Sequence, residues 1–270
     1  MKDLHIHTKY SDGEFDEYQI LQEVLKSGVT EFAICDHDTF EGSKRVYELL
    51  QKENFGLTFH SGVELTCRLN DYENGVNMHV LIRDFDYNNS KLQEIVDEIN
   101  VLRRQKVDIM VDFIEDKFNI KIPKDLLEKK LNSTKSFGKP HLYQLLCEIG
   151  DFDREKFYRT MDGLNTAHLK LDTTKAVQTL KGVGSIFLAH PIEIMKEYHY
   201  DFNDIEKLIA HLKKLGFDGI ETYHSSQTKR VQEELSLIAQ KYNMQESVGS
   251  DFHGPNVKPN LNVGDIQKIF

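Results

Sequence analysis

The segment Asp3-Leu4-His5-Ile6-His7-Thr8, followed by Ser11-Asp12-Gly13, is the most informative stretch of this sequence. In an extended chain, residues two positions apart point to the same side, so His5 and His7 would present both imidazoles together. Two imidazoles with a carboxylate close behind them favour a metal site at the end of a first strand. From this segment alone, a pair of histidines on the wet face of an edge strand remains an equal alternative.

Apolar segments alternate with amphipathic helices along much of the remaining chain. Asp16 and Gln19 have the spacing of a capping box, and Gly28 predicts the end of that first helix. Strands alternating with helices indicate a parallel sheet. Seven strands are predicted, at residues 3–7, 31–35, 57–66, 77–83, 185–189, 219–223 and 246–250. This α/β pattern favours a closed, TIM-like barrel over an open doubly wound sheet.

One region interrupts the alternation, because residues 90–165 show helix patterns without strand patterns. A long helix is expected from about Leu92, a short one from Pro123, and two more over 140–149 and 154–161. We therefore expect a barrel built from residues 1–89 and 166–270, with residues 90–165 as a helical insertion. The insertion is expected to act as a lid over the mouth of the barrel and to shape substrate choice.

Composition excludes several classes of protein. No apolar run among the 270 residues approaches the roughly 20 needed to span a bilayer. The His-x-His motif begins at residue 3 and leaves no room for the apolar region of a signal peptide, so we expect a cytoplasmic protein. The three cysteines are far apart and contain no C-x-x-C motif, which argues against a disulfide framework and against a thiolate zinc site.

Net charge limits the range of partners. At −10 the chain is a poor general binder of duplex nucleic acid, which is held mainly through basic surface. A small phosphorylated substrate remains compatible, because a few well-placed cations are sufficient for it. The sequence indicates no membrane partner and does not reveal the oligomeric state.

His, Asp and Glu recur at the predicted strand ends. In a parallel α/β barrel, functional side chains gather at the carboxyl ends of the strands. Imidazoles and carboxylates without thiolates suit Mn²⁺, Fe²⁺ or Zn²⁺. A set this large exceeds one tetrahedral site and predicts two or three ions sharing a bridging carboxylate, the usual arrangement for displacement at phosphorus. The residues at or near the predicted strand ends include His5, His7, Asp12, Asp36, His37, Asp38, Glu64, His79, His190, Glu221, His224, Asp251 and His253.

The ordered motifs of the chain resemble the polymerase-and-histidinol-phosphatase (PHP) superfamily. They are D-L-H-I-H-T…S-D-G, I-C-D-H-D-T, G-V-E-L, the histidine at 79, A-H-P and S-D-F-H, and they cover essentially the whole chain. The insertion, the segment F-G-K-P-H and the tail P-N-V-K-P-N look most like the branch of stand-alone nucleotide phosphoesterases. The resemblance implies a distorted (β/α)7 barrel and an intact set of metal ligands.

The resemblance also implies how the ligands divide. One ion would take His5, His7, Glu64 and Asp251, a second would take Glu64, His79 and His190, and a third would take Asp12, His37 and His253. Mn²⁺ is the expected ion, with Fe²⁺ or Zn²⁺ as alternatives. Glu64 would be the shared ligand, and Asp12 and Glu64 would support catalysis directly.

The activity expected from this resemblance is hydrolysis of a small nucleotide by metal-activated hydroxide. The substrate would be a nucleoside 3′,5′-bisphosphate, losing its 3′-phosphate, or short RNA trimmed from its 5′ end. The alternatives are a histidinol-phosphate phosphatase and a non-catalytic, regulatory PHP domain. His224 is a candidate general acid and substrate contact, with a hydrogen-bonded rim histidine as the alternative interpretation.

Three further residues are candidate phosphate contacts: Lys139, His141 and Lys170. For either lysine, a solvated helix charge is the alternative. Lys139 stands where the branch usually has arginine, and lysine holds phosphate as a point charge without the bidentate fork. Activity on a bisphosphate is therefore a weaker expectation than activity on some phosphate ester. Asp36 and Asp38, which flank His37, are expected to cap the loop, with metal ligation as the alternative.

Overall fold

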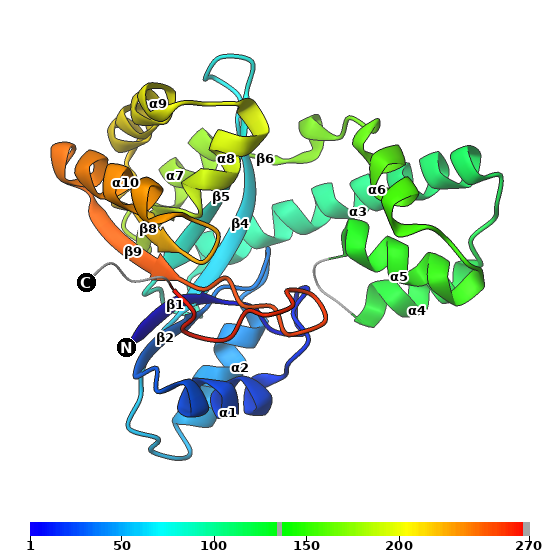
Figure 1. The fold of residues 1–270 in the computed structure, drawn as a ribbon. Coiled ribbons are helices and arrows are strands. Elements are labelled where there is room, and N and C mark those ends of the chain that lie inside the picture. The colour runs from blue at the N-terminus through cyan, green and yellow to red at the C-terminus, as the bar shows by residue number, and fades with distance from the viewer. Residues whose placement is uncertain (134–136, 267–270) are drawn as a thin grey trace.

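The structure is a computed structural model that describes residues 1–133 and 137–266. Its described strands form two sheets (Figure 1). The smaller sheet is parallel, with the order β1 (Lys2–Ile6), β2 (Glu31–Ile34), β3 (Thr58–His60). The larger sheet has the order β6 (Leu171–Asp172), β4 (Gly62–Leu69), β5 (Val76–Arg83), β7 (Ser185–Leu188), β8 (Gly219–His224), β9 (Gln245–Gly249).

The α/β class is confirmed, but the closed barrel is not, because the two sheets do not join into one continuous ladder. Single bridges connect them, from Ile6 to Phe252 and from His37 to Glu64. The strand predicted over 57–66 divides into β3 and β4, which belong to different sheets. At the division, a Cβ on Gly62 would lie 2.5 Å from the carbonyl oxygen of Ile34, so the chain passes too close to β2 for a larger residue.

The prediction of an all-parallel sheet is wrong for β5, which runs antiparallel to both β4 and β7. The connection between β4 and β5 is too short for a crossover helix, so the two strands pair directly as a hairpin. His79 therefore lies in the first half of its strand, opposite Thr66 of β4, rather than at a carboxyl end. The reversed direction still brings it to the edge where the other candidate ligands lie.

Six helices cover the sheets. They are α1 (Glu17–Ser27), α2 (Glu41–Leu50), α7 (Thr173–Leu180), α8 (Pro191–Tyr198), α9 (Phe202–Leu215) and α10 (Lys229–Lys241). The capping box of α1 is present, since the Asp16 side chain accepts from the backbone of Gln19 and the Gln19 side chain accepts from the backbone of Asp16. Gly28 ends α1 with φ of 73°, a conformation that favours glycine.

The segment between β5 and β6 forms a helical lobe at one side of the molecule (Figure 1). It contains α3 (Ser90–Phe118), α4 (Lys124–Ser133), α5 (Lys139–Ile149) and α6 (Arg154–Asp162), and a 3-10 turn, η1 (Ala167–Leu169), leads back to β6. The first half of α3 buries Leu92 and Ile99 in the main core, and its second half buries Val107 and Ile114 in the core of the lobe. One helix thus joins two hydrophobic cores. Within the described residues, the helices are all too short or too polar to cross a membrane.

Candidate metal centre

The first motif forms the base of a buried polar centre. His5 lies in β1 and His7 directly follows it, and both imidazoles are fully buried. The turn after β1 is held by Asp36, whose carboxylate accepts hydrogen bonds from the Thr8 backbone (2.7 Å) and from the Ser11 hydroxyl (2.6 Å). Asp36 therefore braces the loop that carries Asp12, which supports the capping interpretation.

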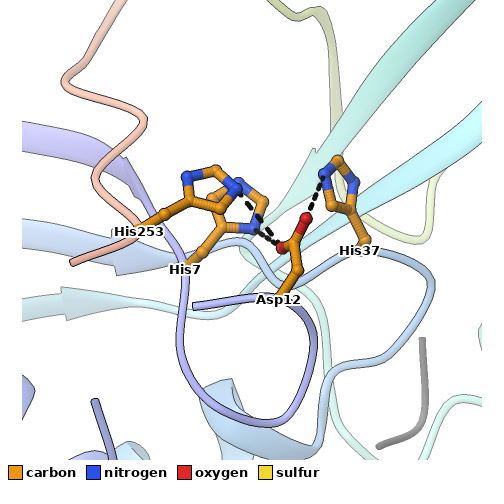
Figure 2. Close-up of side chains that lie close together, drawn as sticks. All are labelled: His7, Asp12, His37 and His253. Atoms are coloured by element: carbon orange, nitrogen blue, oxygen red, sulfur yellow. Dashed lines mark ion pairs between the residues drawn. The ribbon is translucent and has the colours of Figure 1, made fainter. Parts of the chain in front are cut away.

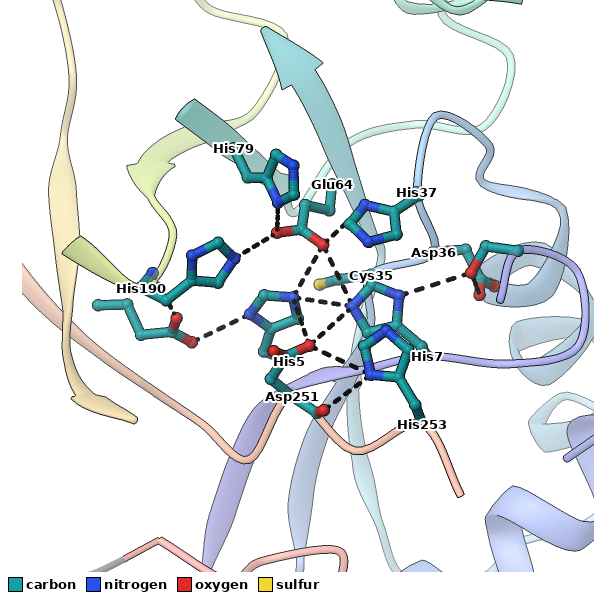
Figure 3. Close-up of polar contacts among 12 residues, drawn as sticks. His5, His7, Cys35, Asp36, His37, Glu64, His79, His190, Asp251 and His253 are labelled. Carbon is teal, nitrogen blue, oxygen red and sulfur yellow. Dashed lines mark hydrogen bonds and ion pairs between the residues drawn. The ribbon is translucent and has the colours of Figure 1, made fainter. Parts of the chain in front are cut away.

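Glu64, in β4, is the hub of the centre (Figure 3). Its fully buried carboxylate lies near five imidazoles, two from the His-x-His segment and three from other parts of the chain. The nitrogen-to-oxygen distances are 3.2 Å for His5, 3.2 Å for His7, 3.1 Å for His37, 2.9 Å for His79 and 2.9 Å for His190. So many nitrogen atoms around one carboxylate are typical of a shared metal ligand.

A second group surrounds Asp12 (Figure 2). Nε2 of His253 lies 3.3 Å from Oδ1 of Asp12, Nε2 of His37 lies 3.7 Å from Oδ2, and Nδ1 of His7 lies 3.7 Å from Oδ1. His7 thus faces both Asp12 and Glu64 through its two ring nitrogens. The atoms of His7, Asp12, His37 and His253 are close enough together to bind one ion.

A third group contains Asp251, in the loop after β9. Its Oδ1 lies 3.2 Å from Nε2 of His7 and 3.8 Å from Nε2 of His5, and its Oδ2 lies 3.4 Å from Nε2 of His224. The backbone N–H of Asp251 donates to the carbonyl of His5 at 2.8 Å, so β1 and this loop are tied directly together. His5, His7 and Asp251 form another group able to bind an ion, as do His37, Glu64 and His79.

The electrostatics of the centre keep its carboxylates ionised. Burial acts to raise the pKa of Glu64, but the charges of His37, His5 and His79 outweigh it and hold that pKa well below its usual value. Against the effect of burial, neighbouring histidines lower the pKa of Asp12 in the same way, and His253 together with Lys258 lowers the pKa of Asp251. Buried carboxylates that stay charged require cations beside them.

The residues present fit divalent ions. Several buried atoms of the centre lack a hydrogen-bond partner within the described structure: Asp12 Oδ1, His37 Nδ1, Glu64 Oε2, His79 Nδ1 and His224 Nε2. Nε2 of His5 and Nε2 of His7 also lie 3.0 Å apart, and both lie close to the carboxylates of Glu64 and Asp251. Nitrogen and oxygen atoms that converge without protons to share are suited to a metal ion.

The backbone is strained at this centre. His190, Asp251 and Asp38 have φ values of 26°, 58° and 55°, in a region that side chains other than glycine rarely adopt. Such conformations cost about 1–3 kcal/mol each and persist where surrounding contacts fix them. Their concentration around Glu64 and Asp251 is typical of a functional site.

The predicted substrate contacts are arranged around the centre. His224 lines a cavity of ≈ 380 Å³ together with His79, His190 and Asp251, and its Nδ1 lies 2.8 Å from the Ser226 hydroxyl. Lys170 lines an adjoining cavity of ≈ 90 Å³ that also contains His79 and His190.

The other two predicted contacts come from the helical lobe. The buried His141 at the start of α5 accepts from the Gly138 backbone at 3.2 Å and lies near Asp12. Nζ of Lys139 lies 3.1 Å from Asp162 of α6, so in this structure its charge already has a partner.

Sequence analysis missed two residues of the centre. The position of Glu221 at the end of a predicted strand does not reveal its partners, yet its buried carboxylate contacts His5 and accepts from the backbone of His190. Lys258, in the tail after β9, forms an ion pair with Asp251 and lines the same cavity as His224. Spacing along the chain gives no signal for either, because each contact joins segments that only the fold brings together.

Comparison with solved structures supports the fold. An amidohydrolase from Chromobacterium violaceum superimposes with a TM-score of 0.81, at 21% identity, over 99% of this chain and 91% of that one. Since this identity is low, the likeness concerns the fold alone.

Relatives are also found by sequence. A protein of Haemophilus influenzae named 5′-3′ exoribonuclease is 29% identical over 94% of this chain and 90% of its own length. A phosphoribosyl 1,2-cyclic phosphate 1,2-diphosphodiesterase of Eggerthella lenta is 25% identical over 94% of both chains. The family model of the PHP domain matches residues 3–236, a span that includes the His-x-His motif, Glu64, His79 and His190. This chain belongs to the PHP domain family.

Proposed function

We propose that this chain is a metal-dependent phosphoesterase that removes nucleotides from the 5′ end of short RNA. The observation that carries the proposal is the convergence of five imidazoles on the buried carboxylate of Glu64. The substrate class follows from the relative that is named 5′-3′ exoribonuclease. Since the chain covers 90% of that relative, the inference concerns proteins of nearly equal extent.

Nine residues would hold two or three divalent ions, with Glu64 shared between them. They are His5, His7, Asp12, His37, Glu64, His79, His190, Asp251 and His253. A mixture of imidazoles and carboxylates suits Mn²⁺ first, and Fe²⁺ or Zn²⁺ as alternatives. When bound, such ions activate water and neutralise the charge of the phosphoryl oxygens.

The remaining residues would orient the substrate and move protons. His224 is our candidate for the general acid that protonates the leaving oxygen. His224 lines the cavity of ≈ 380 Å³, its Nε2 lies 3.4 Å from Oδ2 of Asp251, and the Ser226 hydroxyl lies 2.8 Å from its Nδ1. A general acid must reach the leaving oxygen by a hydrogen bond, and we infer that His224 does so from the wall of this cavity.

The helical lobe, residues 90–165, would act as a lid that brings additional positive charge to the substrate. Lys139 and His141 lie at the start of α5, and Lys170 lies where η1 leads into β6. Burial lowers the pKa of Lys170, and nearby Lys139 is one of the positive charges that lower it further. A cluster of cations with this character favours an anion, and a second phosphate of the substrate is our proposal for it.

The test is phosphate or nucleotide release by Mn²⁺-loaded protein from four substrates. They are a 5′-phosphorylated trinucleotide of RNA, adenosine 3′,5′-bisphosphate, a ribose 1,2-cyclic phosphate and histidinol phosphate. We expect stepwise release of mononucleotides from the 5′ end of the trinucleotide. The Glu64→Gln variant should abolish this release, whereas His60→Gln, on β3 outside the centre, should leave it unchanged.

The other substrates define the outcomes that would change the conclusion. Release from the bisphosphate alone would make the chain a nucleotide 3′-phosphatase, a second candidate that the cations near Lys170 favour. Release from the cyclic phosphate alone would indicate a cyclic-phosphate diesterase, the activity for which the Eggerthella lenta relative is named. Release from histidinol phosphate alone would contradict a nucleotide substrate, and no release from any substrate by metal-loaded protein would contradict the proposal as a whole.

A further inference from the structure

Lys258 places an ammonium group beside Asp251 in the candidate metal centre. Its ammonium donates to the carbonyl oxygen of Asp251 at 3.1 Å and forms an ion pair with the Asp251 carboxylate. The side chain is 34% exposed, so the ammonium is held at the surface of the cavity and is not enclosed. A lysine ammonium has three N–H donors, and hydrogen bonds to Asp251 use only part of this capacity.

The cavity beside this ammonium is otherwise lined by imidazole, carboxyl and hydroxyl groups. Its described lining residues are His37, His79, His190, Glu193, His224, Ser225, Ser226, Asp251, His253 and Lys258. Lys258 is the only lysine or arginine among them. A phosphoryl group entering this space of ≈ 380 Å³ would therefore meet one fixed side-chain cation outside the imidazoles.

The segment that carries Lys258 is fixed by Glu14. The Glu14 carboxylate accepts from the backbone N–H groups of Asn256 (2.6 Å) and Val257 (2.8 Å), and from the Asn256 side chain (2.9 Å). Gly254, with φ of 100°, allows the close approach, because a Cβ there would lie 2.8 Å from Cβ of Glu14. The N–H of Lys258 then donates to the carbonyl of Gly254 at 2.9 Å, which closes the turn.

We propose that Lys258 binds the phosphoryl group of the substrate in this cavity, and that Glu14 is the positioning residue that presents it. This inference rests on the proposed function and adds a contact from the tail of the chain to it. Glu14 follows the Ser11-Asp12-Gly13 turn, so the loop that carries Asp12 also carries the residue that orients Lys258. Binding of phosphate and assembly of the centre are thereby linked through one short loop.

The experiment measures binding of inorganic phosphate to Mn²⁺-loaded protein by calorimetry, with metal content determined on the same samples. Lys258→Met should weaken phosphate binding by at least about tenfold, as expected for loss of a charge-assisted hydrogen bond, with the metal content unchanged. Lys258→Arg should retain most of the binding. The matched control is Lys26→Met on α1, whose side chain is 76% exposed, and it should behave like wild type.

Kinetic measurements distinguish a role of Glu14 in positioning Lys258 from a purely structural role. On the RNA trinucleotide, Lys258→Met should raise KM more than it lowers kcat. Glu14→Gln should raise KM in the same direction, and should add nothing further when Lys258 is already methionine, since both changes act on one contact.

Two results would overturn the inference: phosphate affinity that is unchanged in Lys258→Met, and loss of metal from that variant, which would make Lys258 a structural partner of Asp251 alone. A wild-type protein that binds phosphate but hydrolyses no substrate would contradict the proposed function and leave the binding inference intact.

Discussion

Nδ1 of His5 lies 3.2 Å from Oε1 of Glu221, and both side chains are fully buried. The other oxygen of this carboxylate accepts the backbone N–H of His190 at 2.8 Å. Glu221 therefore connects two candidate metal ligands that are far apart in sequence, His5 and His190, and both of its oxygens are engaged. A carboxylate on the far nitrogen of an imidazole fixes the tautomer and the orientation of the ring.

This relationship predicts the effect of Glu221→Gln, a change that keeps the volume of the side chain. We expect Mn²⁺ affinity to fall about 10- to 100-fold, as observed when such an outer partner of a ligand histidine is lost. Titration of metal-free protein with Mn²⁺ checks the prediction. Glu246→Gln, an exposed position on β9, is the matched control. Equal affinities in the two variants would contradict the role assigned to Glu221.

The grouping of ligands around Asp12 predicts a partial loss of metal. Asp12 contacts His7, His37 and His253 but not Glu64 in the described contacts, so Asp12→Asn should reduce the number of tightly bound ions by one. Glu64→Gln should reduce it further, because Glu64 is shared by five imidazoles. Metal analysis of dialysed samples measures both. An equal loss in the two variants would argue for a single, indivisible cluster.

Lys170 provides a test of how the substrate's second phosphate is held. The side chain is partly buried beside His79 and His190, and burial lowers its pKa. Lys170→Met should raise KM for adenosine 3′,5′-bisphosphate by about tenfold, the usual cost of one charged hydrogen bond. KM for a nucleoside 3′-monophosphate, which lacks the second phosphate, should not change. Equal effects on the two substrates would show that Lys170 does not distinguish them.

Local patterns explain how much of this fold and site was predictable. The His-x-His segment, the capping box of α1 and the helices of the insertion depend on neighbours in sequence, and each was predicted close to its observed bounds. Strand-end positions indicated a larger set of His, Asp and Glu, and the resemblance to the PHP superfamily selected nine of them as ligands; the structure brings these nine into one centre.

Long-range packing explains the rest. The division at Gly62 depends on the close approach of β2, and the antiparallel direction of β5 depends on pairing with β4. Glu221 contacts a histidine 216 positions away, which no periodicity along the chain can reveal. His60, which also lies in a segment predicted to be a strand, contacts Asp84 and Glu31 and none of the candidate ligands in the described contacts.

The ion pair of His60 predicts a pH-dependent stability. The hydrogen bond to Asp84 raises the pKa of His60 against the opposing effect of burial, and the same bond lowers the pKa of Asp84. A raised histidine pKa stabilises the fold fully below the unfolded value of about 6.5, and this contribution is lost as pH rises through the folded value. The Asp84 contribution is present above about pH 4 and is lost as pH falls.

The destabilisation caused by His60→Gln should therefore be larger at pH 6 than at pH 9. Urea denaturation of metal-saturated protein at the two pH values measures it. His168→Gln, at an exposed position in η1, serves as the control and should show no such difference. A His60→Gln penalty that grows with pH would mean that the pair does not stabilise the protonated ring.

The last prediction concerns the contact that ties the helical lobe to the metal centre. Arg103 of α3 forms an ion pair with the fully buried Asp38, next to His37, and also donates to the carbonyl of Phe137 at 3.2 Å. Removing one partner of a buried pair leaves an uncompensated charge and costs roughly 3–5 kcal/mol, so Arg103→Met should lower the free energy of unfolding strongly.

The double variant Arg103→Met, Asp38→Asn should recover much of this loss, because the buried charge is then removed together with its partner. Denaturation of the two single variants and the double variant gives the coupling energy. Additive losses would mean that Arg103 stabilises the lobe through Phe137 and packing alone. A strong coupling would mean that the lobe is anchored on the loop of His37. A displacement of α3 would then shift that loop and the candidate ligand it carries.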